Sequence, residues 1–81
     1  MTKDRTKYSK IYKQLGENIR KYRKKRKISQ EELAFRISSA RNYIGCIERA
    51  EKAPSLATVF DIARALNLQL EDLFKDLDEN S

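Results

Sequence analysis

Side chains able to hydrogen-bond with nucleic-acid bases lie close together between residues 41 and 49, which read RNYIGCIER. Arginine can donate two hydrogen bonds to guanine, and asparagine can pair with the amino and N7 groups of adenine, so this chemistry suits the major groove of DNA. A cysteine one turn later adds a soft, weakly donating thiol. A helix over this segment would turn one strip outward, made of Arg41, Asn42, Gly45, Cys46 and Arg49.

Each of these residues also has a plainer interpretation. Arg41 could be a solvated surface arginine, and Asn42 could hydrogen-bond the backbone of its own helical turn. Cys46 could be an inert small residue rather than a redox switch, and Gly45 could reflect sequence drift rather than a close approach of two backbones.

Two short helices would position this strip. Ser29 can accept hydrogen bonds from the free amides of a new helix while Glu32 reaches back to the Ser29 amide, so a helix is predicted to begin at Gln30. The polar stretch 38–40 interrupts the apolar pattern, and two helices of roughly eight residues joined by a short turn form a helix-turn-helix. The apolar residues at helical spacing are Leu33, Ala34, Ile37, Ile44 and Ile47.

Further helices flank this motif. Apolar spacing predicts a firm first helix over residues 13–25 that could begin as early as Tyr8, although Gly16 weakens its middle. Pro54 and the cap Ser55 begin a fourth helix, and a fifth is predicted from Leu70 to about Leu77. No strand signal or repeat is present, so the fold is predicted to be all-α with five helices. The predicted segments are a flexible basic arm (1–10), a domain (11–77) and an acidic tail (78–81).

Length and composition exclude several classes of protein. With 81 residues and 40% hydrophobic content, the chain can form one small domain. It has no histidine and one cysteine, which excludes a histidine-based metal site, a zinc ribbon and a disulfide framework, and no cofactor is expected. No apolar run approaches the roughly 18 residues of a membrane span, and no secretion signal is visible, so a cytoplasmic location is expected.

Charge is divided along the chain. The net charge is +6, but residues 1–27 hold twelve basic against two acidic residues, a local charge of +10. Residues 28–53 are neutral, and residues 54–81 hold two basic against six acidic residues, a local charge of −4. The first part of the chain would attract a polyanion, and the last part would repel it.

Taken together, the motifs resemble the XRE family, the Cro and phage-repressor type of helix-turn-helix domain. The resemblance covers residues 15–74 and implies a five-helix, lambda repressor-like fold; small controller-type regulators are the nearest parallel. The matching motifs are Ile19-Arg20-x-x-Arg23, Ser29-Gln30-x-x-Leu33-Ala34, Tyr43-Ile44-x-x-Ile47-Glu48-Arg49, Pro54-Ser55-Leu56, Ile62-Ala63-x-x-Leu66 and Leu70-x-x-Leu73-Phe74.

The family resemblance implies roles for individual residues. Arg23 and Glu48 would form a structural ion pair that holds the second helix of the motif in place. The residues implied to contact bases are Gln30, Arg41, Asn42 and Cys46. Those implied to contact the DNA backbone are Ser29, Tyr43, Arg49 and Lys52.

The chain departs from the family pattern at several turns and caps. Ser38 and Ala50 occupy positions that usually hold glycine, and neither adopts positive φ easily. Ala40 and Gln69 replace the usual capping residues. These departures concern the geometry of the turn and therefore the tilt of the second helix.

These features predict a sequence-specific, DNA-binding transcriptional regulator that acts as a homodimer on an inverted repeat, with no small-molecule effector. Phe60, Leu68 and Leu77 are the candidates for the dimer surface, although each could serve intramolecular packing instead. The alternative is a protein-interaction module, such as an adaptor or antitoxin-like subunit. A basic amphipathic helix lying on a membrane is disfavoured because its apolar face is needed for the core. No pairing of nucleophile and base is recognisable, so no enzyme activity is expected.

Overall fold

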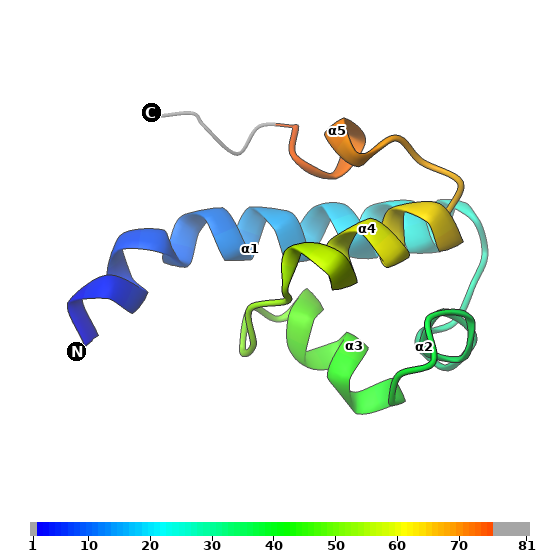
Figure 1. Ribbon diagram of the computed structural model, residues 1–81, viewed down its shortest axis with the longest axis horizontal. Helices are drawn as coiled ribbons and strands as arrows, with labels where there is room; N and C mark the ends of the chain where they lie inside the picture. Colours follow the sequence, from blue (N-terminus) through cyan, green and yellow to red (C-terminus); the bar gives the residue numbers. More distant parts are fainter. Residues whose placement is uncertain (1, 76–81) are drawn as a thin grey trace.

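A computed structural model describes the backbone of residues 2–75 and the side chains of residues 8–75. This part of the chain contains α1 (Thr2–Lys25), α2 (Gln30–Arg36), α3 (Arg41–Glu48), α4 (Leu56–Ala65) and α5 (Leu70–Leu73). It has no strand, and the predicted all-α fold with five helices is confirmed. Figure 1 shows α1 crossing the molecule, with α5 on one side and the α2–α3 pair on the other.

Two helix boundaries differ from the sequence prediction. α1 begins at Thr2, earlier than the predicted start, and the helical apolar spacing through Ile11 and Tyr8 accounts for its extension as far as Tyr8. The backbone of the predicted arm at residues 1–10 is therefore helical from Thr2 onward, and the flexibility of this segment stays a prediction. The last helix, predicted to run to about Leu77, ends at Leu73. Leu77 and the predicted acidic tail lie outside the described residues.

A side chain from α1 caps the C-terminal end of α5 and accounts for its early termination. The buried Asn18 side chain donates its Nδ2 hydrogens to the carbonyl oxygens of Leu73 (2.9 Å) and Lys75 (3.0 Å). It thereby satisfies carbonyl groups that have no partner at a helix C-terminus. Asp72 bonds the Gln69 amide at the other end of α5 (3.0 Å), so a carboxylate compensates for the missing Ser or Thr cap. α5 is thus a single turn fixed at both ends.

The core consists of the apolar faces that the sequence pattern predicts. α1 packs against α3 and α5, α4 packs against α2 and α5, and α2 packs against α3. Ala34 is 2% exposed, which fits a close crossing of the two helices of the motif. The buried apolar residues are Leu15, Ile19, Leu33, Ala34, Ile44, Ile47, Val59, Ile62, Ala63, Leu66 and Leu73.

Gly16 allows α1 to cross α3 at very short range. A Cβ atom at Gly16 would lie 2.5 Å from the Ile47 carbonyl oxygen and 2.7 Å from that of Glu48. Side chains cannot approach a backbone so closely, so only glycine fits this crossing. The glycine that weakens α1 as an isolated helix is therefore required by the tertiary structure.

Four helices end in the same way, although none has glycine at the critical position. At the end of α3, the Ala50 amide bonds to the Ile47 carbonyl (3.0 Å) and the Glu51 amide to the Cys46 carbonyl (2.8 Å), which is the Schellman arrangement. The usual turn geometry is therefore kept where the sequence lacks glycine. The described non-glycine residues with positive φ are Lys27 (59°), Ser38 (56°), Ala50 (63°) and Asn67 (59°).

Two arginines tie the helix-turn-helix motif and α1 to the end of α4. Arg26 donates to the Leu66 carbonyl oxygen (2.8 Å), and Arg36 donates to that of Ala65 (3.2 Å). Cationic donors at a helix C-terminus satisfy its last carbonyl groups and complement the helix dipole. These bonds help to fix α2 relative to the remainder of the fold.

Candidate nucleic-acid interface

The helix-turn-helix begins at a side-chain cap. Ser29 Oγ accepts a hydrogen bond from the Glu32 amide at 3.0 Å, and α2 begins at Gln30 as predicted. The predicted reciprocal bond is not formed, because the Glu32 carboxylate accepts a hydrogen bond from Arg36 Nε instead (2.9 Å). Glu32 therefore forms an i,i+4 ion pair with Arg36 instead of the second hydrogen bond of the capping box.

α3 presents the predicted polar strip to solvent only in part. Arg41 and Asn42 are exposed at its first turn, whereas Tyr43 and Cys46 are half-buried. Ala40 makes no side-chain bond to the first amides of α3, as its chemistry predicts. The first turn of α3 is thus the part most open to a ligand. The buried residues of this helix are Ile44, Gly45, Ile47 and Glu48.

A bidentate ion pair holds the C-terminal end of α3. Arg23 Nε donates to Glu48 Oε2 at 2.7 Å, and Arg23 Nη2 donates to Oε1 at 3.1 Å. Both side chains are nearly removed from solvent, at 10% and 3% exposed. Arg23 Nη1 also donates to the Ile28 carbonyl (2.9 Å), so the guanidinium connects α1, the segment before α2, and α3. The geometry matches the ion pair that the resemblance implies.

Gln30 completes this network. Its Nε2 donates to Glu48 Oε1 at 3.0 Å, so the glutamine locks α2 onto α3. The family resemblance implies a base-contacting role for Gln30. In the structure its nitrogen has a positioning role, and its own Oε1 has no donor among the described side chains. Capping patterns say nothing about a partner 18 positions away, so this role had no local sequence signal.

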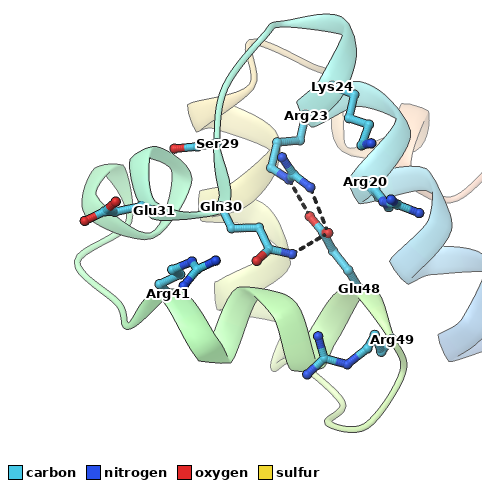
Figure 2. Close-up of a pocket in the computed structure, with 9 residues that line it drawn as sticks. All are labelled: Arg20, Arg23, Lys24, Ser29, Gln30, Glu31, Arg41, Glu48 and Arg49. Carbon is cyan, nitrogen blue, oxygen red and sulfur yellow. Dashed lines mark hydrogen bonds and ion pairs between the residues drawn. The ribbon is translucent and has the colours of Figure 1, made fainter.

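An open depression of about 630 Å³ lies where α1, α2 and α3 meet. Figure 2 shows the Arg23–Glu48–Gln30 network forming its floor, with cationic side chains around it. Four of the predicted contact residues line it together: Ser29, Gln30, Arg41 and Arg49. The other four, Asn42, Tyr43, Cys46 and Lys52, do not.

Sequence reasoning assigned no role to two further basic residues of this depression. Arg20 and Lys24 are exposed on α1 and line the depression beside Arg23. Residues four positions apart share one face of a helix, so their spacing around Arg23 was a usable signal. They bring the positive charge of α1 next to α3.

Arg49, directly after α3, forms an exposed ion pair with Glu51. Arg49 Nε donates to Glu51 Oε2 at 2.9 Å, and Nη2 donates to Oε1 at 3.2 Å. The hydrogen bond and charge of the guanidinium lower the pKa of the Glu51 carboxyl, while the same bond raises the pKa of Arg49. Both groups are therefore charged at neutral pH.

The candidate dimer residues lie on α4 and the segment after it. Phe60 is 47% exposed, and the Arg64 guanidinium lies 5.7 Å from the centre of its ring. Leu68 is half-buried and packs against the core. Leu56, one turn before Phe60, is 69% exposed and adds to this face.

Comparison with known proteins agrees with this geometry. The family model described as helix-turn-helix matches residues 19–73. The control protein C.SmaI of Serratia marcescens is 42% identical over 59 residues, which cover 73% of this chain and 70% of that protein. The control protein C.BamHI of Bacillus amyloliquefaciens is 41% identical over 59 residues, covering 72% and 73%.

A solved structure shows the same fold. The crystal structure of the restriction-modification controller protein C.AhdI from Aeromonas hydrophila matches with a TM-score of 0.76 at 33% identity, covering 78% of this chain and 96% of that one. The names of these relatives describe controller proteins rather than enzymes, in agreement with the prediction for this chain. Over the described residues, no helix is both long and apolar enough to cross a membrane. The motifs, the fold and the relatives lead to one conclusion: this chain belongs to the helix-turn-helix family of DNA-binding transcriptional regulators, of the XRE type.

Proposed function

We propose that the chain recognises a specific DNA sequence by inserting α3 into the major groove, where Arg41 and Asn42 read base edges. The observation that carries this proposal is the exposure of these two side chains on a helix whose C-terminal end is held by Arg23, Gln30 and Glu48. Base readout needs donors at fixed positions, and the buried network supplies that rigidity.

The cationic side chains around α3 supply attraction that does not depend on sequence. Arg20 and Lys24 border the depression, and Ser29, Tyr43 and Lys52 are proposed to contact phosphates nearby. Such contacts fix the orientation of a protein on the duplex without reading bases. The acidic residues are concentrated in the C-terminal part of the chain, where their negative charge would repel DNA and so oppose wrapping of the duplex around the protein.

A single α3 reads only a few base pairs, so we propose a homodimer on an inverted repeat. Two α3 helices about 34 Å apart would meet successive major grooves on one side of the duplex. Phe60 and Leu68 are the proposed dimer residues within the described chain, and the exposed Leu56 supports an apolar contact on this face. The similarity to control proteins supports a controller-type regulator acting in the cytoplasm.

Selection of bound duplexes from a random pool tests this function. A palindromic consensus is the expected result, and a pool without enrichment would refute sequence-specific binding. Arg41→Ala should change the preferred base at one position in each half-site, whereas Lys52→Ala should weaken all duplexes alike. The affinity should also fall with salt by about 0.9 log units per log unit for each phosphate neutralised.

One observation favours the alternative of a protein-interaction module. Phe35 projects from α2 with 79% of its surface exposed, and aromatic residues are enriched in protein–protein interfaces. In that case duplex binding would ignore sequence, and Phe35→Ser would abolish capture of the partner without changing DNA affinity. The same random-pool selection therefore separates the two functions.

A further inference from the structure

The ion pair between Arg49 and Glu51 lies at the edge of the depression, where Glu51 can fix the orientation of the Arg49 guanidinium as well as balance its charge. Arg49 follows the last turn of α3 and lines the depression beside Gln30 and Arg41. Its side chain and that of Glu51 are 58% and 55% exposed, so the pair is not part of the core. An exposed pair of this kind contributes little to stability, which leaves its geometry to be explained.

Gly45 provides the space in which the guanidinium lies. A Cβ atom at this position would be 3.0 Å from Arg49 Nη1 and 3.5 Å from Gln30 Oε1. The arginine therefore folds back across the α3 backbone toward Gln30. Glycine has a lower helix propensity than alanine, and the room that it leaves for Arg49 accounts for its presence in α3.

Glu51 determines which edge of the guanidinium remains available. The carboxylate occupies the edge formed by Nε and Nη2. The adjacent edge, formed by Nη1 and Nη2, hydrogen-bonds only to the Cys46 sulfur, 3.9 Å from Nη2, among the described residues. Sulfur is a weak acceptor that a base could displace. This second edge can still make the two parallel hydrogen bonds with which arginine recognises O6 and N7 of guanine.

The pairing also argues against a simple phosphate contact. A phosphate contact uses positive charge, and the neighbouring carboxylate cancels that charge within the pair. A base contact depends on the orientation of the hydrogen-bond donors, and the bidentate bond to Glu51 fixes the plane of the Arg49 guanidinium before DNA binds. Glu51 would thus lower the attraction of the protein to any duplex while holding the Arg49 donors in one orientation for base recognition.

We propose that Arg49 reads a guanine edge and that Glu51 is the positioning residue that aims it, an inference that rests on the function proposed above. It replaces the role in DNA-backbone contact that the family resemblance implies for Arg49. Specificity in the chain would then come from both ends of α3, with Arg41 at its start and Arg49 just after its end.

The test compares Glu51→Gln with a matched control, Glu32→Gln. The control removes one carboxylate from another exposed ion pair, Arg36–Glu32, which has the same 2.9 Å separation but lies outside the depression. Each full-length variant is titrated with the duplex selected by the wild type and with a scrambled duplex, at several salt concentrations. Thermal unfolding of each variant confirms that the fold is intact.

Glu51→Gln should raise affinity for the scrambled duplex and lower the ratio of specific to non-specific affinity by about threefold or more, whereas Glu32→Gln should leave the ratio unchanged. Arg49→Met should lower that ratio by about fivefold or more, and random-pool selection with this variant should relax a single guanine in each half-site.

An equal rise in both affinities for Glu51→Gln would overturn the inference, because Glu51 would then only repel DNA. An equal loss for Arg49→Met would overturn it by showing a phosphate contact. A wild type that binds both duplexes equally refutes the proposed function and this inference together, so the wild-type measurement distinguishes the two failures.

Discussion

The same substitution, glycine to alanine, should have opposite effects in α1 and α3. In α1, a Cβ on Gly16 would lie 2.5 Å from the Ile47 carbonyl oxygen, which is 0.9 Å short of the 3.4 Å at which ordinary contact begins. The obstacle is the backbone of α3, which cannot rotate away as a side chain can. Relief requires α1 and α3 to separate, and their packing includes the fully buried Ile19 and Ile44.

The magnitude follows from two opposing terms. Overpacking of a well-packed site costs typically ~1–3 kcal/mol, and the backbone obstacle places Gly16→Ala near the upper end of this range. The gain in helix propensity offsets ~1 kcal/mol, which leaves a net loss of about 2 kcal/mol in the free energy of unfolding. For a domain of this size, that corresponds to a melting temperature lower by roughly 8–16 °C.

Gly45→Ala is the matched control. Its nearest obstacle is Arg49 Nη1 at 3.0 Å, the end of an exposed side chain that can move. The gain in helix propensity should therefore dominate and stabilise the fold by up to about 1 kcal/mol. Urea and thermal unfolding of both variants are followed by circular dichroism, at several protein concentrations so that the proposed dimerisation is taken into account. The reasoning is refuted if Gly16→Ala is as stable as the wild type, or if both variants change stability in the same direction.

Three further predictions concern the network, the helix ends and α5. Glu48→Ala leaves Arg23 buried without its carboxylate and should cost about 3–5 kcal/mol, enough to loosen the domain and weaken DNA binding indirectly; an unchanged melting temperature would contradict this. Ala50→Gly should stabilise the protein by about 0.5–1 kcal/mol. The left-handed conformation of residue 50 costs roughly 1–2 kcal/mol when the residue has a Cβ, and glycine removes this cost. Part of the gain is lost because glycine raises the conformational entropy of the unfolded chain. Ala57→Gly, at an exposed right-handed position of α4, is its control and should destabilise instead; a loss for both would refute the explanation. Asn18→Ala removes the donor to the Leu73 and Lys75 carbonyls and should cost about 1–3 kcal/mol in urea unfolding, more than Gln14→Ala, which removes only the bond to Asn18. Equal losses for the Asn18 and Gln14 variants would mean that the cap on α5 contributes little.

Much of the fold could be predicted because its signals are local. Ser29 and Ser55 cap the helices that follow them, and apolar residues at helical spacing form the core. The Arg23–Glu48 pair, 25 positions apart, was predicted through the family resemblance and not through any local pattern. The departures at Ser38 and Ala50 proved compatible with the usual turns, because hydrogen bonds at the helix ends hold both residues in the left-handed region.

The remaining parts of the candidate site depend on contacts between distant segments. The pairing of Gln30 with Glu48 and the lining of the depression by Arg20 and Lys24 arise only when α1, α2 and α3 are packed together. The half-buried position of Cys46 likewise follows from how α3 rests on the core.

The sequence by itself determined the helical fold, the helix-turn-helix motif and the basic character of the first half of the chain, because periodicity, capping and charge are properties of neighbouring residues. Only the tertiary structure decided that Gly16 meets the backbone of α3, that Gln30 holds the network and that Arg49 lines the same depression as Gln30. The physical reason is that each of these roles depends on the distance and direction between groups from different elements. Those distances are fixed by packing and not by sequence spacing.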